Sequence, residues 1–108
     1  MKIKFFRGDN HKVRFRFTKY RGEIEKMYFT VKDEVRNVIL TKKLGDGSFE
    51  KDGDWYVIKF VPKDTDNLQF WLELTYDIEI IVEGEKYTIK KDIFQIEEDV
   101  TRPEEEVE

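Results

Sequence analysis

Acidic side chains at alternating positions are the residues here whose type and spacing come closest to a catalytic pattern. Glu73, Asp77 and Glu79 lie in one alternating segment, and residues two apart on a strand face are separated by about 6.6 Å. Two carboxylates about 5 to 9.5 Å apart across a cleft can hydrolyse glycosides. Any solvated strand gives the same spacing, so the pattern favours a charged sheet face whose carboxylates meet cations of neighbouring strands. A small hydrolytic enzyme that uses Asp77 and Glu79 is therefore the third hypothesis for the function of the chain.

Few other residues could form a catalytic or metal-binding site. The one histidine, His11, and the one serine, Ser48, have no partners at a spacing that predicts a triad or a metal site. Asp46, Asp52 and Asp54 are close in sequence, but they lack the spacing of a calcium-binding loop. The chain has no cysteine and no glycine-rich phosphate loop. We therefore expect a non-enzymatic protein without cofactor or metal.

Surface aromatic residues are the remaining candidates for binding. Four aromatic residues are not all expected in the core: Trp55, Trp71, Tyr20 and Tyr28. Trp71 and Ile81 fall on the otherwise polar face of the alternating segment 72–82 and its start. Exposed aromatic side chains can stack on sugars or bury against a protein partner, whereas a covering loop or the second sheet would explain them equally well. The candidate interface consists of Trp71, Ile81, Trp55 and Tyr28.

Charge is unevenly distributed along the 108 residues. Residues 1–47 carry 13 Lys and Arg against 6 Asp and Glu, whereas residues 48–108 carry 7 against 18. A basic half could indicate a nucleic-acid partner, but the chain as a whole is acidic, with a formal net charge of −4. The favoured interpretation is that strands of both halves interleave in one sheet and neutralise each other, with no nucleic-acid partner.

The elements that must position these side chains are strands. Apolar residues alternate with polar ones in short segments, as half-buried antiparallel strands require. The clearest segments are 12–17, 27–32, 38–42, 56–60, 72–82, 87–89 and 94–96. Turn residues separate them at short intervals, including Asp52-Gly53 and Glu83-Gly84-Glu85. The parity changes between Ile89 and Phe94, which one extra residue near Lys91-Asp92 would explain, either as a β-bulge or as a strand that switches sheets.

This pattern predicts an all-β fold, an antiparallel sandwich of about seven strands in residues 1–101. A short helical turn is expected near residues 63–68, because Pro62 and the Asp, Thr and Asn after it favour one. Residues 102–108 continue an acidic stretch and are expected to form a solvated tail. No stretch has the length and apolarity of a signal peptide or a membrane span, so we expect no membrane partner and no export.

Several segments, in order, resemble a known family. They are Arg7-Gly8-Asp9-Asn10, then residues 60–68 and 74–80, then residues 84–89, and finally Phe94-Gln95-Ile96 with Asp99-Val100-Thr101. Together they resemble the immunoglobulin-like N-terminal domain of phage baseplate upper proteins and related phage structural proteins, over about residues 5–101. The chain departs from that family at Phe70-Trp71-Leu72-Glu73 and at Asp92, where the family has small residues or glycine.

The resemblance implies an immunoglobulin-like sandwich that works as a virion component. Its partners would be other tail, baseplate or head proteins, contacted as a homo- or hetero-oligomer. It would be found in the virion, or in the host cytoplasm during assembly. It supplies no catalytic residues. The alternative function is a carbohydrate-binding sandwich that uses Trp55, Trp71 and nearby tyrosines.

Overall fold

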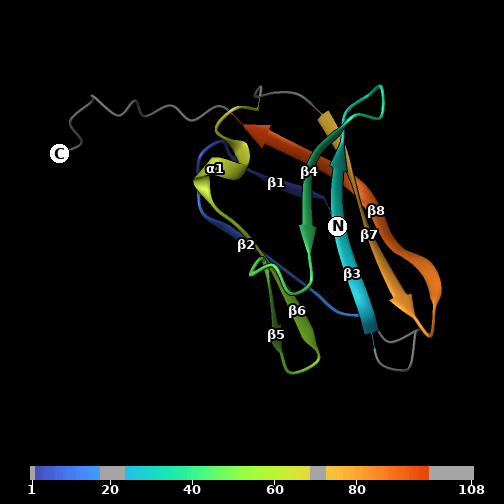
Figure 1. Ribbon diagram of the computed structural model, residues 1–108. Coiled ribbons are helices and arrows are strands. Elements are labelled where there is room, and N and C mark those ends of the chain that lie inside the picture. Colours follow the sequence, from blue (N-terminus) through green and yellow to red (C-terminus); the bar gives the residue numbers. More distant parts are fainter. Residues whose placement is uncertain (1, 18–23, 69–72, 98–108) are drawn as a thin grey trace.

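Figure 1 presents the computed structural model of the chain, which describes residues 2–17, 24–68 and 73–97. Eight strands and one short helix follow one another within these residues. They are β1 (Ile3–Phe6), β2 (His11–Phe15), β3 (Ile24–Lys32), β4 (Val38–Lys43), β5 (Phe49–Asp52), β6 (Trp55–Phe60), α1 (Pro62–Thr65), β7 (Glu73–Val82) and β8 (Glu85–Glu97).

The strands form two sheets. Sheet A has five strands in the order β1-β8-β7-β3-β4, and sheet B has three in the order β2-β6-β5. In an immunoglobulin-like sandwich one sheet joins strands G, F, C and C′ and the other joins B, E and D. When the strands are lettered along the chain, β8, β7, β3 and β4 correspond to G, F, C and C′. In the same way, β2, β6 and β5 correspond to B, E and D. The predicted all-β immunoglobulin-like sandwich is confirmed, with eight described strands rather than about seven.

One strand pair departs from the predicted antiparallel arrangement. β1 runs parallel to β8, with Ile3 opposite Phe94 and Phe6 opposite Glu97, whereas the other described pairs are antiparallel. Two parallel strands cannot be joined by a hairpin, and here the rest of the sandwich lies between them in sequence. The pairing is therefore non-local, and the residue pattern of β1 does not reveal it.

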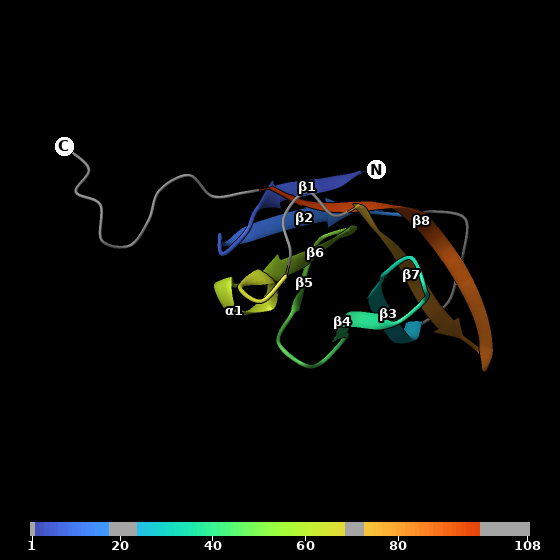
Figure 2. The same cartoon turned by 90° about the horizontal axis from the view of Figure 1, so that it is seen from above.

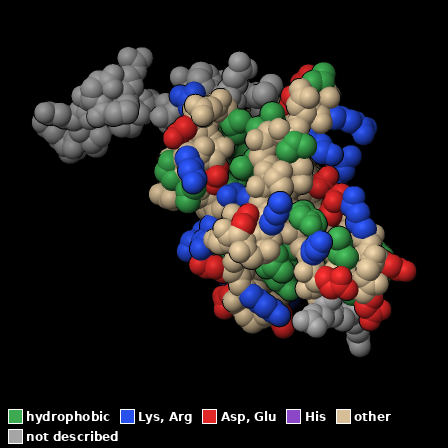
Figure 3. All heavy atoms as spheres, viewed as in Figure 1, with side chains coloured by type: hydrophobic (Ala, Val, Ile, Leu, Met, Phe, Trp, Pro, Cys, Tyr) green, Lys and Arg blue, Asp and Glu red, His purple; other side chains and the backbone are tan. Residues whose placement is uncertain are grey.

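Strands from the basic and acidic halves of the sequence interleave in sheet A. β3 and β4 come from the first half, and β3 pairs with β7 from the second half. At the other edge, Lys4 of β1 forms an ion pair with Glu97 of β8 at 2.9 Å. Figure 3 shows Lys and Arg interspersed with Asp and Glu over the face of the molecule in view. The two halves therefore neutralise each other across strand pairs.

The core lies between the sheets and is rich in aromatic rings. Phe60 of sheet B packs against Phe29 and Phe94 of sheet A, with ring centroids 5.5 and 5.8 Å apart. In β7 the even-numbered residues are all buried, as the alternation predicted. Burial of large apolar side chains is the main favourable term in folding, so these rings hold the two sheets together.

The short helix α1 joins the end of β6 in sheet B to the segment before β7 in sheet A (Figure 1). Pro62 occupies its first turn, where the missing N–H costs nothing. The Asp64 carboxylate accepts a hydrogen bond from the Val61 N–H at 2.8 Å and pairs with Lys42 of β4 at 2.8 Å. The predicted helical turn is confirmed, and this ion pair ties it to the edge of sheet A.

β8 contains the extra residue that the parity change predicted, but at a different position. The register passes from Ile78 opposite Lys90 to Glu79 opposite Thr88, which leaves Ile89 as the unpaired residue. The predicted place, Lys91-Asp92, is therefore wrong by two to three residues. A bulge twists its strand and redirects the side chain at that point. Ile89 is half-buried and packs against the core cluster.

Candidate functional site

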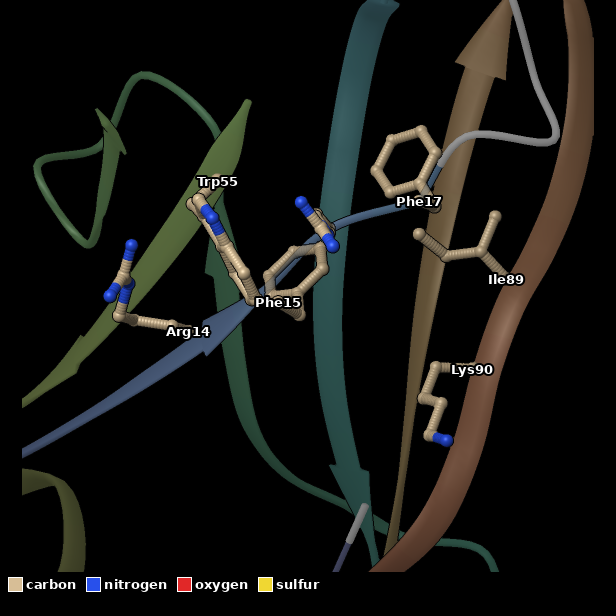
Figure 4. Close-up of a pocket in the computed structure, with 7 residues that line it drawn as sticks. Arg14, Phe15, Phe17, Trp55, Ile89 and Lys90 are labelled. Atoms are coloured by element: carbon tan, nitrogen blue, oxygen red, sulfur yellow. The ribbon is translucent and has the colours of Figure 1, made fainter. Parts of the chain in front are cut away.

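An open cleft lies beside the C-terminal end of β2 (Figure 4). It has a volume of about 270 Å³. We call it the Arg–Trp cleft, and its lining residues are Arg14, Phe15, Arg16, Phe17, Trp55, Ile89 and Lys90. The first four come from β2 and the two residues that follow it, Trp55 begins β6, and the last two belong to β8. The cleft is therefore lined by residues of both sheets, from β2 and β6 of sheet B and from β8 of sheet A.

The alternation of β2 positions the two arginines. Phe15 is buried in the core, so Arg14 and Arg16 on either side of it are directed away from the core. Their guanidinium carbons lie 4.6 and 4.8 Å from the centroid of the Trp55 ring. A guanidinium over an indole face is attracted by the ring quadrupole. Arg14 also approaches Asp52, which is opposite Trp55 on β5, at 3.7 Å.

Apolar side chains form the inner wall of the cleft. Phe15, Phe17 and Tyr56 stack on one another, with ring centroids 5.7 to 6.4 Å apart. In Figure 4 Phe17 lies next to Ile89, the bulged residue of β8. The bulge thus supplies an aliphatic wall facing an aromatic one, a combination that suits an apolar side chain of a ligand.

Among the described residues, β1 pairs with only the C-terminal part of the outer edge of β8. β1 pairs with Phe94–Glu97, and within residues 2–17, 24–68 and 73–97 the preceding part of β8 pairs with β7 alone. Figure 2 shows β8 running well beyond β1. An edge with unpaired backbone groups can accept an added strand.

The residues of the candidate interface do not form one site. Trp55 lies in the Arg–Trp cleft. Tyr28 and Ile81 are half-buried on the outer face of sheet A, where Tyr28 is opposite Glu79 and Ile81 is opposite Lys26, so they are diagonal neighbours. Trp71 lies outside the described residues. Trp55 is therefore on a different surface from Tyr28 and Ile81.

The cationic and aromatic partners of Trp55 were missed by sequence reasoning. The alternation of residues 14–17 predicts a strand but does not by itself predict a binding site. A sequence feature that could have indicated the site is nevertheless present, since alternating Arg and Phe give this strand one cationic face and one aromatic face. Lys90 carries no such signal, because its place in the cleft depends on the bulge in β8.

The carboxylates of Asp77 and Glu79 in β7 lie on a sheet face where lysines of β8 offset their negative charge. Asp77 is opposite Lys91 of β8, and Glu79 pairs with Lys86 at 3.3 Å. Burial, with a smaller contribution from Glu79, raises the pKa of Asp77, and its buried Oδ1 has no hydrogen-bond partner.

The geometry around these carboxylates does not resemble a glycosidase site. Asp77 borders a shallow depression of about 300 Å³ with Lys32, Arg36 and Lys91, and Glu79 does not line it. The two carboxylates are neighbours along one strand and do not face each other across a cleft. This arrangement matches the charged sheet face that the sequence favoured.

The remaining polar candidates have local structural contacts. His11 stacks on Phe5 with ring centroids 4.6 Å apart, and burial lowers its pKa against the opposing effect of Asp9. Asp46 accepts hydrogen bonds from the Lys43 and Ser48 N–H groups at 2.8 Å, which closes the turn before β5. Among the described residues, no three His, Cys, Asp or Glu side chains are grouped to hold a metal ion.

Comparison with known proteins gives no assignment: no protein-family model matches the chain, and no curated protein matches it significantly. Within the described residues, no helix is long and apolar enough to cross a membrane.

Proposed function

We propose that this chain is a non-enzymatic structural protein of a phage or phage-tail-like particle, which packs through the Arg–Trp cleft against neighbouring virion subunits, either other proteins or further copies of this chain. The cleft itself carries the proposal. It combines an aromatic and aliphatic wall with guanidinium groups, and aromatic residues and arginine are the types enriched where protein partners bind most strongly. Beside it lies the part of the β8 edge that does not pair with β1.

The phage assignment rests on the ordered sequence motifs. The immunoglobulin-like strand order fits the fold that they imply, although many unrelated functions share this fold. Two observations test the assignment. Genes for capsid, tail or lysis proteins should neighbour the gene for this chain, and mass spectrometry of purified particles should detect the chain. Particles without the chain would overturn the proposal.

Sugar binding is less well supported by the geometry. Two guanidinium groups lie over the Trp55 ring, so they would have to move before a sugar could stack there. Tyr28 is on another surface. Tryptophan fluorescence titrated with a panel of glycans should stay flat, whereas a saturable change that is lost in Trp55→Ala would favour the carbohydrate-binding alternative.

A further inference from the structure

The Arg–Trp cleft is a cationic site in an acidic protein. Arg14, Arg16 and Lys90 line it, whereas the chain has a formal net charge of −4. Asp52 approaches Arg14 only at 3.7 Å, and the two side chains are 75% and 55% exposed. Such an exposed pair contributes little, so the cleft keeps a surplus of positive charge that favours an anionic partner.

The wall of the cleft adds a second requirement. Phe17 and Ile89, both half-buried, add apolar surface to its lining, and a simple anion would make no contact of matching chemistry with that surface. A fitting partner is an extended segment that carries carboxylates around a small apolar side chain. The carboxylates would meet the arginines and Lys90, and the apolar side chain would cover the wall.

The chain contains such a segment. Residues 98–108 include six Asp or Glu and one Arg. Val107 stands within this stretch, preceded by Glu104-Glu105-Glu106 and followed by Glu108. The segment thus has the composition that the cleft requires.

We propose that the acidic C-terminal segment, residues 98–108, of a second copy of this chain binds in the Arg–Trp cleft. The inference rests on the proposed function, and it names the partner of the same site. Because each copy has one segment and one cleft, the contact is head-to-tail, and it closes into a dimer or ring or extends into a chain of subunits.

Strand direction favours a second copy over the same copy. From Lys90 at the cleft, β8 runs on to its end at Glu97, and these seven residues of strand span about 23 Å. Residues 98–108 therefore begin about 23 Å from their own cleft, after a strand that leads away from it, and would have to reverse direction to reach it. A segment from a second copy needs no such reversal.

The test uses the full chain and two charge variants, examined by sedimentation velocity over a range of concentrations and salt. The cleft variant carries Arg14→Glu and Arg16→Glu, and the segment variant carries Glu104→Gln, Glu105→Gln and Glu106→Gln. The unsubstituted chain should self-associate, less so at high salt, because salt screens exposed charges. Each variant alone should associate at least about tenfold more weakly, since several exposed ion pairs are lost.

Mixing the two variants is the decisive step. The cleft variant still has an intact segment and the segment variant an intact cleft, so an equimolar mixture should form a heterodimer. The matched control carries Lys26→Glu and Lys43→Glu, the same charge change at exposed positions on β3 and β4 of sheet A, and it should associate like the unsubstituted chain. Thermal unfolding of each variant verifies that it is folded.

Two results would overturn the inference. One is an unsubstituted chain that stays monomeric and fails to bind a labelled peptide of residues 98–108. The other is a mixture that stays monomeric although the unsubstituted chain associates. Neither bears on the proposed function, because the presence of the chain in purified particles and its cross-links to other virion proteins are measured separately.

Discussion

The buried ion pair between β4 and α1 gives the sharpest prediction about the scaffold that holds the cleft. Lys42 Nζ lies 2.8 Å from Asp64 Oδ2, and the two side chains are only 6% and 10% exposed. Lys42→Met keeps the aliphatic stem but removes the ammonium. The Asp64 carboxylate then stays nearly buried, with the Val61 N–H as its remaining described donor.

The expected cost follows from this geometry. Removing one partner of a fully buried ion pair costs about 3–5 kcal/mol. Asp64 retains a backbone hydrogen bond and some access to water, so we expect about 2–3 kcal/mol for Lys42→Met. The double variant Lys42→Met with Asp64→Asn should lose at least about 1 kcal/mol less than the sum of the two single variants, because the two groups interact directly.

Equilibrium unfolding in urea, followed by circular dichroism, measures these free energies. The matched control is Lys59→Met, which breaks the Lys59–Glu50 pair at 2.9 Å, where the side chains are 33% and 52% exposed. Such a pair contributes less than about 1 kcal/mol. If Lys42→Met cost no more than Lys59→Met, or if the two single variants were additive, the ion pair would not stabilise the fold as described.

Four further substitutions test the core, the charge on Asp77 and the turn at Gly8. Ile78→Ala and Phe15→Ala should each lower the free energy of unfolding in urea by about 2–5 kcal/mol, because both side chains are buried; a loss under about 1 kcal/mol would contradict their place in the core. The pKa of Asp77 is raised in the fold, so the native state binds this proton more tightly than the unfolded chain, and stability falls as pH rises through the titration of Asp77. Asp77→Asn should therefore raise the urea midpoint at pH 7 and reduce that fall, whereas a lower midpoint at pH 7 would show that the charge is favourable. Gly8→Ala should cost about 1–2 kcal/mol, since Gly8 has φ +79° and a Cβ would lie 3.1 Å from Asp66 Oδ1; an unchanged melting temperature would refute this.

Local pattern predicted most of the fold. The period of two located the strands and their buried faces, as in β7, where the alternation from Leu74 to Val82 matches the observed burial. Turn residues such as Gly53 and Gly84 fell between strands with positive φ, as expected. Pro62 marked the short helix correctly. These features depend on neighbours in sequence, which is why the sequence reveals them.

Non-local features could not be predicted in the same way. The partner of β1 depends on which edge remains free after the rest of the sandwich has formed. The bulge at Ile89 depends on the register between β7 and β8, and the parity change locates it only to within a few residues. The cleft could not be predicted for both reasons: it brings the end of β2 next to β8, which lies far away in sequence, and it includes the bulged residue Ile89. Trp55 could be singled out as a surface aromatic residue, but its arginine partners and Lys90 required the fold.

Hydroxyl-radical footprinting of the chain inside purified particles, compared with the free chain, measures whether the Arg–Trp cleft becomes covered on assembly. Mass spectrometry then compares the oxidation of Trp55 in the cleft with that of Ile81 on the outer face of sheet A. If the cleft is the packing surface, oxidation of Trp55 falls severalfold on assembly while that of Ile81 changes little. Equal oxidation of Trp55 in the free and assembled chain would contradict the account.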